Sequence, residues 1–294
     1  MLRSHRAVAL LLIAAAAATS AAQKPPSSPS TPAAAESDPW QRLEPGLELG
    51  VFRSPRPSTA GDSRVRALRI DPARFSFHLL NASAPGAAGT RTARQWCRER
   101  GMTAAINASM YQGDHRTSVS LMRTRGHVNN PRLTKDMTVL AFDPDSGRPE
   151  LPPVRILDRQ CDDYDALAAR YGTLVQSIRM LSCTGRNVWQ QQPRRWSTAA
   201  IGVAGGGRVL FLHARSPYSV HDLIEILREL PLGLARAMYV EGGPEAQLYV
   251  ESGGRAFEFV GSYETGFNEN DDNAAAWPVP NVVAIRRRGG EGGG

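Results

Sequence analysis

Residues 208–250 read RVLFLHARSPYSVHDLIEILRELPLGLARAMYVEGGPEAQLYV, two apolar runs that flank an amphipathic segment. The runs RVLFLHA (208–214) and ARAMYV (235–240) are typical of buried strands. Between them, residues 219–230 have helical periodicity, with Ser219 as a cap, Asp222 completing a capping box, and Pro231 and Gly233 ending the helix. Its apolar face comprises Val220, Leu223, Ile224, Leu227 and Leu230. The stretch therefore predicts a βαβ unit near 208–241, with a right-handed crossover between parallel strands.

Strand-like segments continue on both sides of this unit. LELGVFRS (47–54), RVRALRI (64–70) and RFSFHLLNA (74–82) alternate in the manner of an antiparallel sheet. TARQWCRERG (92–101) predicts a short helix, and further strands are expected at AQLYV, AFEFVG and NVVAI. The pattern predicts an α+β fold: a single domain with a mixed, twisted β-sheet core and a few flanking helices.

The two ends of the chain differ in composition from its centre. Residues 1–22 have Arg3 and Arg6 before a short apolar core and a small-residue cleavage site, which is typical of a secretory signal peptide. An uncleaved anchor is the alternative. Residues 23–39 form a Pro/Ser/Ala-rich linker, 40–288 one domain and 289–294 a Gly-rich tail. We therefore expect a secreted or periplasmic protein without a membrane span after cleavage, whose oligomeric state stays open.

The chain is basic, and almost all of its positive charge is arginine. The formal net charge is +7, and removal of Arg3 and Arg6 leaves 7 − 2 = +5. No basic run is interleaved with aromatic residues, so nucleic acid is not an expected partner. The arginine fork suits phosphate and carboxylate groups, although a GC-rich coding bias also explains such a composition. Of three cysteines, Cys161 and Cys183 are the preferred disulfide pair, with Cys97 buried in a helix.

Glu241 ends a hydrophobic strand and is followed by two glycines and a proline. Ligand sites in α/β sheets often lie at such strand ends. Gly242 and Gly243 allow close backbone approach to a ligand or positive φ, and Pro244 stiffens the loop. Glu241 is the candidate catalytic carboxylate. The alternative is a strand-end glutamate neutralised by an arginine.

Polar residues also follow the strand that ends at Asn107. The loop after it contains Tyr111 and Asp114, and such amide and aromatic groups suit a sugar site; a hairpin whose Asn and Gly residues form turns is the alternative. Gln176 and Arg179 are polar positions within the apolar run LVQSIRML (174–181), which is otherwise a strand half facing water.

Two further groups of charged residues stand out. Arg194 and Arg195 precede a glycine turn and are able to meet an anionic group. The loop 261–273 gathers four acidic residues, which suits calcium although the spacing is not that of an EF-hand; a solvated acidic loop is the alternative. These residues are Glu264, Glu269, Asp271 and Asp272. No cysteine and histidine spacing predicts another metal site.

Taken in order, several of these motifs resemble the phosphodiester glycosidase family over roughly residues 100–286. They are INASMY (106–111), SVSL (118–121), QSIRML (176–181), AAIGVAGGGRVLFL (199–212), YVEGGPEAQLY (239–249) and PVPNVVAI (278–285). The last two correspond to the pattern L-D-G-G-x-S-x-x-L-Y and to the final strand of the family. The resemblance implies most directly that Asn107 and Glu241 belong to the site.

The chain departs from the family pattern at several positions. Glu241 replaces the aspartate before the glycine pair, and Ser109 and Ser120 stand where glycines are usual. Ile178 and Arg179 replace Gly-Pro, and Thr198 stands where the family has an arginine. With these departures the chain resembles a divergent branch of the family, and together with the predicted signal peptide this implies an exported member of bacterial type.

The implied reaction is hydrolysis of a sugar-1-phosphodiester or a related envelope glycan linkage. A phosphate monoester leaves as an anion whose second pKa is about 6, so general-acid help is less necessary. Glu241 is expected to stabilise the oxocarbenium-like centre or activate water, Asn107 to orient the sugar, and Asp114 to be a reserve carboxylate.

The cationic and neutral groups of the predicted site are expected to bind the substrate. Arg179 and Arg195 are expected on the phosphate, with Gln176, Tyr111, Gly242 and Gly243 as further substrate-binding residues. Two alternatives stay open: a catalytically inactive carbohydrate-binding envelope protein, and a hydrolase of ordinary glycosides or phosphodiesters. An ordinary glycoside with an alcohol leaving group requires a second, protonated carboxyl near Glu241.

Overall fold

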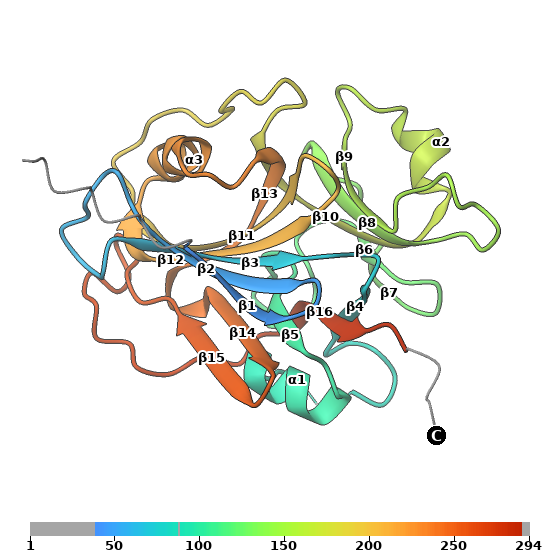
Figure 1. Cartoon of the computed structure of the whole chain (residues 1–294), viewed down its shortest axis with the longest axis horizontal. Coiled ribbons are helices and arrows are strands. Elements are labelled where there is room, and N and C mark those ends of the chain that lie inside the picture. Colours follow the sequence, from blue (N-terminus) through green and yellow to red (C-terminus); the bar gives the residue numbers. More distant parts are fainter. Residues whose placement is uncertain (1–38, 88, 290–294) are drawn as a thin grey trace, which may run out of the picture. The chain divides into compact units, whose positions relative to one another are not determined.

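The fold is built from two antiparallel β-sheets, described by a computed structural model over residues 39–87 and 89–289 (Figure 1). The predicted signal peptide (1–22), most of the linker (23–38) and most of the tail (290–294) lie outside the described residues. The described residues belong to one compact unit. No helix within them is long and apolar enough to cross a membrane.

The larger sheet has eleven strands, nine of which follow one another along a continuous path. In spatial order these are β1 (Trp40–Glu44), β2 (Leu47–Arg53), β3 (Arg64–Ile70), β12 (Val209–Tyr218), β11 (Trp196–Ala204), β13 (Leu234–Gly242), β10 (Tyr171–Leu181), β6 (Met122–Arg123) and β7 (Val128–Asn130). Two more strands extend from β10, namely β8 (Thr138–Pro144) and β9 (Val154–Asp158).

The smaller sheet has five strands and packs on the larger one. Its spatial order is β15 (Arg255–Val260), β14 (Gln247–Ser252), β5 (Ala104–Asn107), β16 (Asn281–Arg287) and β4 (Phe75–Asn81). The main hydrophobic core lies between the sheets, because it combines Phe211 and Val240 of the larger sheet with Ile106, Leu248 and Val283 of the smaller one.

Helices cover the outer faces of the two sheets (Figure 1). Helix α3 (Val220–Glu229) buries Leu223 and Leu227 against β12, β11 and β13 of the larger sheet. Helix α1 (Ala93–Arg100) buries Trp96 and Cys97 against Ala105 and other residues of the smaller sheet. The layers are thus helix, large sheet, small sheet and helix, with α2 (Tyr164–Ala168) beside β9 and β10.

Local signals in the sequence explain where the helices begin and end. Thr92 and Gln95 form a reciprocal capping box at α1, and Gly101 ends the helix with φ of 61°. At α3 the Ser219 hydroxyl accepts from the Asp222 backbone N–H at 3.1 Å and donates to the Asp222 carboxylate at 2.8 Å. Both predicted helices are therefore confirmed within one residue of the expected bounds.

The predicted mixed sheet is wrong, and the βαβ unit is confirmed only in part. Strands β12 and β13 do run parallel across α3, but β11 lies between them and pairs antiparallel with each. All pairings of the named strands in the described residues are antiparallel. The hairpin of β11 and β12 turns at Gly206 and Gly207, both with positive φ, and this hairpin places β11 in the gap.

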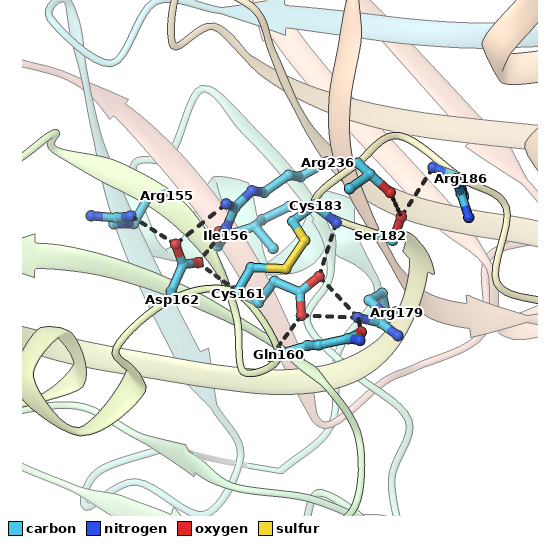
Figure 2. The surroundings of a disulfide bond; sticks show 12 residues. Arg155, Ile156, Gln160, Cys161, Asp162, Arg179, Ser182, Cys183, Arg186 and Arg236 are labelled. Atoms are coloured by element: carbon cyan, nitrogen blue, oxygen red, sulfur yellow. Dashed lines mark hydrogen bonds and ion pairs between the residues drawn. A yellow bond between two sulfur atoms is a disulfide. The ribbon is translucent and has the colours of Figure 1, made fainter.

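The predicted disulfide is confirmed. Cys161 and Cys183 are joined with Cα atoms 6.4 Å apart, and Cys97 is a buried free thiol. Figure 2 shows the carboxylate of Asp162 meeting Arg155 and Arg236 beside this bond, with Arg179 on its other side. The disulfide therefore anchors a charged network at one end of β9 and β10.

Candidate active site

A cleft of about 390 Å³ opens where β13 ends. Its lining comes from four separate stretches of chain: the loop after β5, the start of β11, the end of β13 with the following turn, and the loop after β15. The lining residues are Met110, Tyr111, Gln112, Gly113, His115, Arg194, Trp196, Tyr239, Glu241, Gly242, Glu245 and Glu264. The cleft thus holds three carboxyl groups, one guanidinium group and one imidazole group among aromatic rings.

Glu241 reaches the cleft from an irregular point of the sheet. The register between β11 and β13 shifts beside it, since Ala200 pairs with Tyr239 whereas Ala199 pairs with Glu241. Such a bulge bends a strand and redirects its side chains. The Glu241 carboxylate accepts a hydrogen bond from the Gly242 backbone N–H at 3.0 Å.

The pKa of Glu241 is raised from 4.5 to about 8. Burial is the main cause because it disfavours the charged form, and the negative charges of Glu245 and Glu264 act in the same direction. The hydrogen bond from Gly242 opposes these effects. At neutral pH Glu241 is therefore mainly protonated.

Glu245 lies four residues later, in a short 3-10 helix, η1 (Gly243–Glu245), that begins directly after β13. Burial raises its pKa, and so does the charge of Glu264. The Tyr111 hydroxyl lies 3.5 Å from its carboxylate. A second acid of unusual pKa thus stands beside Glu241.

Asn107 holds the turn that presents Glu245. Its side-chain amide donates to the Glu245 carbonyl oxygen at 3.0 Å and accepts from the Gln247 backbone N–H at 2.8 Å. The residue is only 1% exposed and is not among the residues that line the cleft. Asn107 therefore holds the backbone that carries Glu245, whereas the sequence-based expectation was that it orients the sugar.

Glu264 enters the cleft from the loop after β15. Its backbone forms isolated bridges with Trp196 and with Asn268, which tie the loop to the start of β11. Arg194 lies 4.0 Å from the Glu264 carboxylate and is 61% exposed. This loose, solvated pair leaves the guanidinium group accessible to a ligand.

Aromatic side chains form the walls of the cleft. Trp196 and Tyr239 meet edge to face with ring centroids 6.5 Å apart, and Tyr111 contacts His115 at 5.4 Å. A β-carbon on Gly242 would lie 2.2 Å from the Tyr239 hydroxyl and 2.6 Å from the Trp196 ring. Only glycine at this position allows the aromatic wall and the Glu241 strand to pack together.

Other predicted site residues lie outside the cleft lining. Gln176 is fully buried, where it accepts from Leu121 and Thr134 and donates to the carbonyl oxygens of Thr134 and Asp136. Asp114 is exposed and accepts from the backbone and hydroxyl of Thr117 within its own turn.

The two arginines predicted on the phosphate also lie elsewhere. Arg179 is held by both carboxylate oxygens of the buried Asp158 at 3.0 Å and lines a different hollow. Arg195 is exposed and pairs through its backbone with Thr265. Of the nine residues predicted for the site, Tyr111, Glu241 and Gly242 line the cleft, and Gly243 is buried next to Gly242 in the chain.

Three residues of the cleft lining, Glu245, Trp196 and Tyr239, were not expected in the site from the sequence. Glu245 had a signal, because it stands at the serine of the pattern L-D-G-G-x-S. Trp196 and Tyr239 belong to strands with ordinary apolar patterning, so nothing in their neighbours distinguishes a cleft wall from core.

The acidic loop does not gather ligands for a cation. Asp271 pairs with Arg215 at 2.7 Å, Glu269 accepts from the Gly266 backbone, and Glu264 faces the cleft. In the described part of the chain, the one group of three candidate metal-binding side chains within 4.8 Å is Asp158, Cys161 and Cys183. Its cysteines form the disulfide, so these residues do not fit a metal.

Replacement of Gly243 by alanine is expected to disturb the cleft. Gly243 has φ of 65°, and an added β-carbon would lie 2.4 Å from the Glu264 carboxylate. Gly254 is the matched control, because its φ is 74° and open space surrounds it. We expect both alanine variants to lose about 1–2 kcal/mol in denaturant unfolding, whereas only Gly243→Ala weakens turnover or ligand binding. Equal ligand binding by the two variants would contradict this account.

The cleft brings together three carboxyl groups and aromatic rings, and paired carboxyl groups are what glycoside hydrolysis uses. The model of the phosphodiester glycosidase family matches residues 100–286, so the chain belongs to this family. The comparison with curated proteins found no match.

Two solved structures share the fold. One is the catalytic domain of zebrafish N-acetylglucosamine-1-phosphodiester alpha-N-acetylglucosaminidase, auto-inhibited by its pro-peptide. It is 13% identical, with a TM-score of 0.60 over 84% of this chain and 86% of that chain. The other is a hypothetical protein from Synechocystis, 14% identical, with a TM-score of 0.56 over 86% of this chain and 65% of that chain.

Proposed function

We propose that this chain is an exported glycosidase that hydrolyses the anomeric C–O bond of a sugar-1-phosphodiester or a related envelope glycan linkage. The observation that supports this most directly is the cleft at the end of β13, where Glu241 has a pKa of about 8 and lies among two further glutamates. Family membership supports the same reaction class.

In the proposed mechanism Glu241 is the acid. Protonated at neutral pH, it donates a proton or a hydrogen bond to the departing oxygen atom, and a carboxylate at Glu245 or Glu264 stabilises the oxocarbenium-like centre or activates water. This differs from the sequence-based expectation, in which Glu241 was the charged carboxylate. The reassignment follows from its burial among like charges.

Protonation of Glu241 also reduces the electrostatic repulsion between the cleft and an anionic substrate. Three ionised glutamates would repel a phosphodiester, and the cleft lining has only Arg194 and His115 as basic side chains. A neutral Glu241 removes one negative charge and offers a hydrogen-bond donor, while Arg194 provides a fork that matches phosphate oxygens. The rings of Tyr111 and Trp196 supply the aromatic faces on which a sugar packs.

A second candidate function is hydrolysis of an ordinary glycoside with an alcohol leaving group. The observation that favours it is the presence of other carboxyl groups beside a protonated Glu241. An acid and a carboxylate together are what an alcohol leaving group requires. A carbohydrate-binding protein without catalysis is the third possibility, and it predicts binding with no product.

Export is part of the proposal. The apolar start of the chain is typical of a signal peptide, and a structural disulfide is typical of proteins in oxidising compartments. Recovery of mature protein beginning near residue 23 from the periplasm or the medium of the native host would support it. Recovery of the full chain in the cytoplasm would overturn it.

The reaction is tested by incubating the purified protein with three sets of substrates: sugar-1-phosphodiesters, alkyl glycosides and isolated envelope glycans. Product formation is scored by mass spectrometry, and binding by calorimetry. Release of free sugar together with the phosphate monoester of the other alcohol supports the first candidate, whereas sugar-1-phosphate as the product would indicate cleavage of the P–O bond. Release of an alcohol from the glycosides supports the second. Binding without either product would overturn the enzymatic proposal.

The neighbouring arginines provide a charge test of the phosphodiester proposal. Arg194→Gln is expected to lower kcat/KM for a sugar-1-phosphodiester by about tenfold, because a charge-assisted hydrogen bond contributes about 1.5–3 kcal/mol and the group is partly exposed. Arg195→Gln removes the same charge outside the cleft lining and is expected to leave kcat/KM within twofold. Equal losses would indicate a general electrostatic effect and remove Arg194 from phosphate binding.

A further inference from the structure

The loop after β15 carries more than the cleft carboxylate. Glu264 begins a tight turn, in which the backbone N–H groups of Phe267 and Asn268 donate to the Glu264 carbonyl oxygen at 3.1 and 2.9 Å. Glu264 lines the cleft, whereas Phe267 and Asn268 line a second hollow of about 400 Å³. A single turn therefore contributes to both hollows.

Two aromatic rings stand exposed at the second hollow. Phe267 is 65% exposed and is the most exposed large hydrophobic side chain in the described residues, and Trp277 is 36% exposed. Their rings meet edge to face with centroids 6.1 Å apart. Polar side chains of Asn268 and Asp272 adjoin them in the hollow lining.

The loop is held in place by hydrogen bonds that do not involve these rings. The Ser262 hydroxyl accepts from the Asn273 backbone and donates to the Asn270 carbonyl oxygen, and the Asn273 amide donates to the Gly261 carbonyl oxygen. At the far end, the Gln247 amide donates to the Trp277 carbonyl oxygen at 2.8 Å. The rings are thus presented to solvent by a pre-organised scaffold, which lowers the entropic cost of binding.

We propose that Phe267 and Trp277 form a second sugar-binding subsite, which holds a unit of a glycan chain beyond the one bound in the cleft. Apolar ring faces with amide and carboxylate groups beside them match the apolar faces and hydroxyl groups of a pyranose. Continuity with the cleft through the Glu264 turn favours a carbohydrate over a protein partner. The inference rests on the proposed function, because it takes the cleft as the site of the first sugar.

The subsite predicts that binding strengthens with glycan length. Defined oligosaccharides of one to six units, including N-acetylglucosamine and glucose series, are titrated into the full-length protein carrying Glu241→Gln, so that hydrolysis does not intervene. We expect longer members to bind at least tenfold tighter than single units. Phe267→Ala and Trp277→Ala are each expected to remove about tenfold of this gain and to leave single-unit affinity unchanged. Phe267→Tyr should restore it.

Val128→Ala is the matched control, since Val128 is also exposed, at 53%, and lies on β7. Length-dependent binding that Phe267→Ala removes supports the subsite even when no substrate is hydrolysed, so its outcome is separate from that of the catalytic proposal. Affinity independent of length, failure of every probe to bind, or equal effects of Val128→Ala would overturn it. Loss of self-association in Phe267→Ala with unchanged glycan affinity would identify a protein contact instead.

Discussion

Glu241→Gln is expected to lower kcat/KM for an alkyl glycoside by about 10²–10⁴-fold, the usual contribution of a general acid. For a sugar-1-phosphodiester the loss is expected to be much smaller, because the phosphate monoester leaves as a stable anion. Glutamine also retains a neutral hydrogen-bond donor where the protonated acid stood. Steady-state kinetics on the two substrate classes measures this difference.

Other outcomes would assign Glu241 differently. Equally large losses on both substrate classes would show that its charge is needed, as in the sequence-based expectation of a stabilising carboxylate. Unchanged turnover on both would remove Glu241 from the mechanism. Glu258→Gln is a suitable control, because Glu258 pairs with Arg94 at the surface of β15 and does not line the cleft.

The Glu241→Gln variant is also expected to differ from wild type in how its free energy of unfolding depends on pH. The pKa of Glu241 in the folded protein, about 8, lies above the ordinary value of 4.5. Between pH 4.5 and pH 8, Glu241 keeps its proton in the folded protein but releases it in the unfolded chain. The contribution of Glu241 to the free energy of unfolding is therefore fully present below pH 4.5 and is lost as pH rises through 8. One pKa unit corresponds to about 1.4 kcal/mol. The expected effect on stability is smaller than the full shift would give, because Glu241 is half-buried rather than fully enclosed.

Glutamine does not ionise, so in Glu241→Gln the free energy of unfolding does not fall with rising pH on account of residue 241. We expect wild type and variant to have similar midpoints of thermal unfolding at pH 5, and the variant to be more stable by on the order of 1–3 kcal/mol at pH 8.5. Differential scanning calorimetry across this range measures both. The activity of wild type on alkyl glycosides should decline with an apparent pKa near 8, and a variant less stable than wild type at pH 8.5 would argue against the raised pKa.

Removal of the Cys161–Cys183 disulfide is expected to have the largest effect on stability. The bond links residues separated by 22 positions, for which loss of the constraint on the unfolded chain costs about 3 kcal/mol. It also positions the Cys183 backbone N–H, which donates to Asp158 at 3.1 Å. The double variant Cys161→Ala/Cys183→Ala should therefore unfold at least 6 °C lower, at about 2–4 °C per kcal/mol for a domain of this size.

The third cysteine, Cys97, provides a control for effects of reductant that do not involve the disulfide. Cys97 is a buried free thiol in α1, so it is already reduced and offers reductant no bond to cleave. Cys97→Ala should respond to reductant as wild type does, whereas the double variant should not respond at all. An unchanged unfolding midpoint in the double variant would show that the crosslink does not constrain the unfolded chain.

Local order was largely predictable from the sequence. The bounds of α1 and α3 follow from the caps Thr92 and Ser219, and the strands β2, β3 and β4 follow from alternation of apolar residues. The positive φ of Gly243 was also among the roles expected of the glycine pair. All of these depend on interactions within a few residues, which a sequence displays directly.

The sheet topology and the composition of the cleft were decided by tertiary structure. Strand β11 forms a hairpin with β12 and also pairs with β13, so it lies between the two. No periodicity in the sequence specifies this arrangement. The sequence shows that Gln176 and Arg179 are polar positions within β10. It does not show that Arg179 binds the carboxylate of Asp158 or that Gln176 accepts a hydrogen bond from the backbone of Thr134.

Local patterns in the sequence therefore predicted α1 and α3, most strands, the disulfide pair and one acid of the candidate site, but not α2. Only the tertiary structure brought Glu245, Glu264, Arg194 and Trp196 to that acid, from segments far apart along the chain. The physical reason is that local periodicity determines the direction of a side chain relative to its own strand. Burial and neighbouring charge, which set the pKa of Glu241, depend on residues that other strands supply.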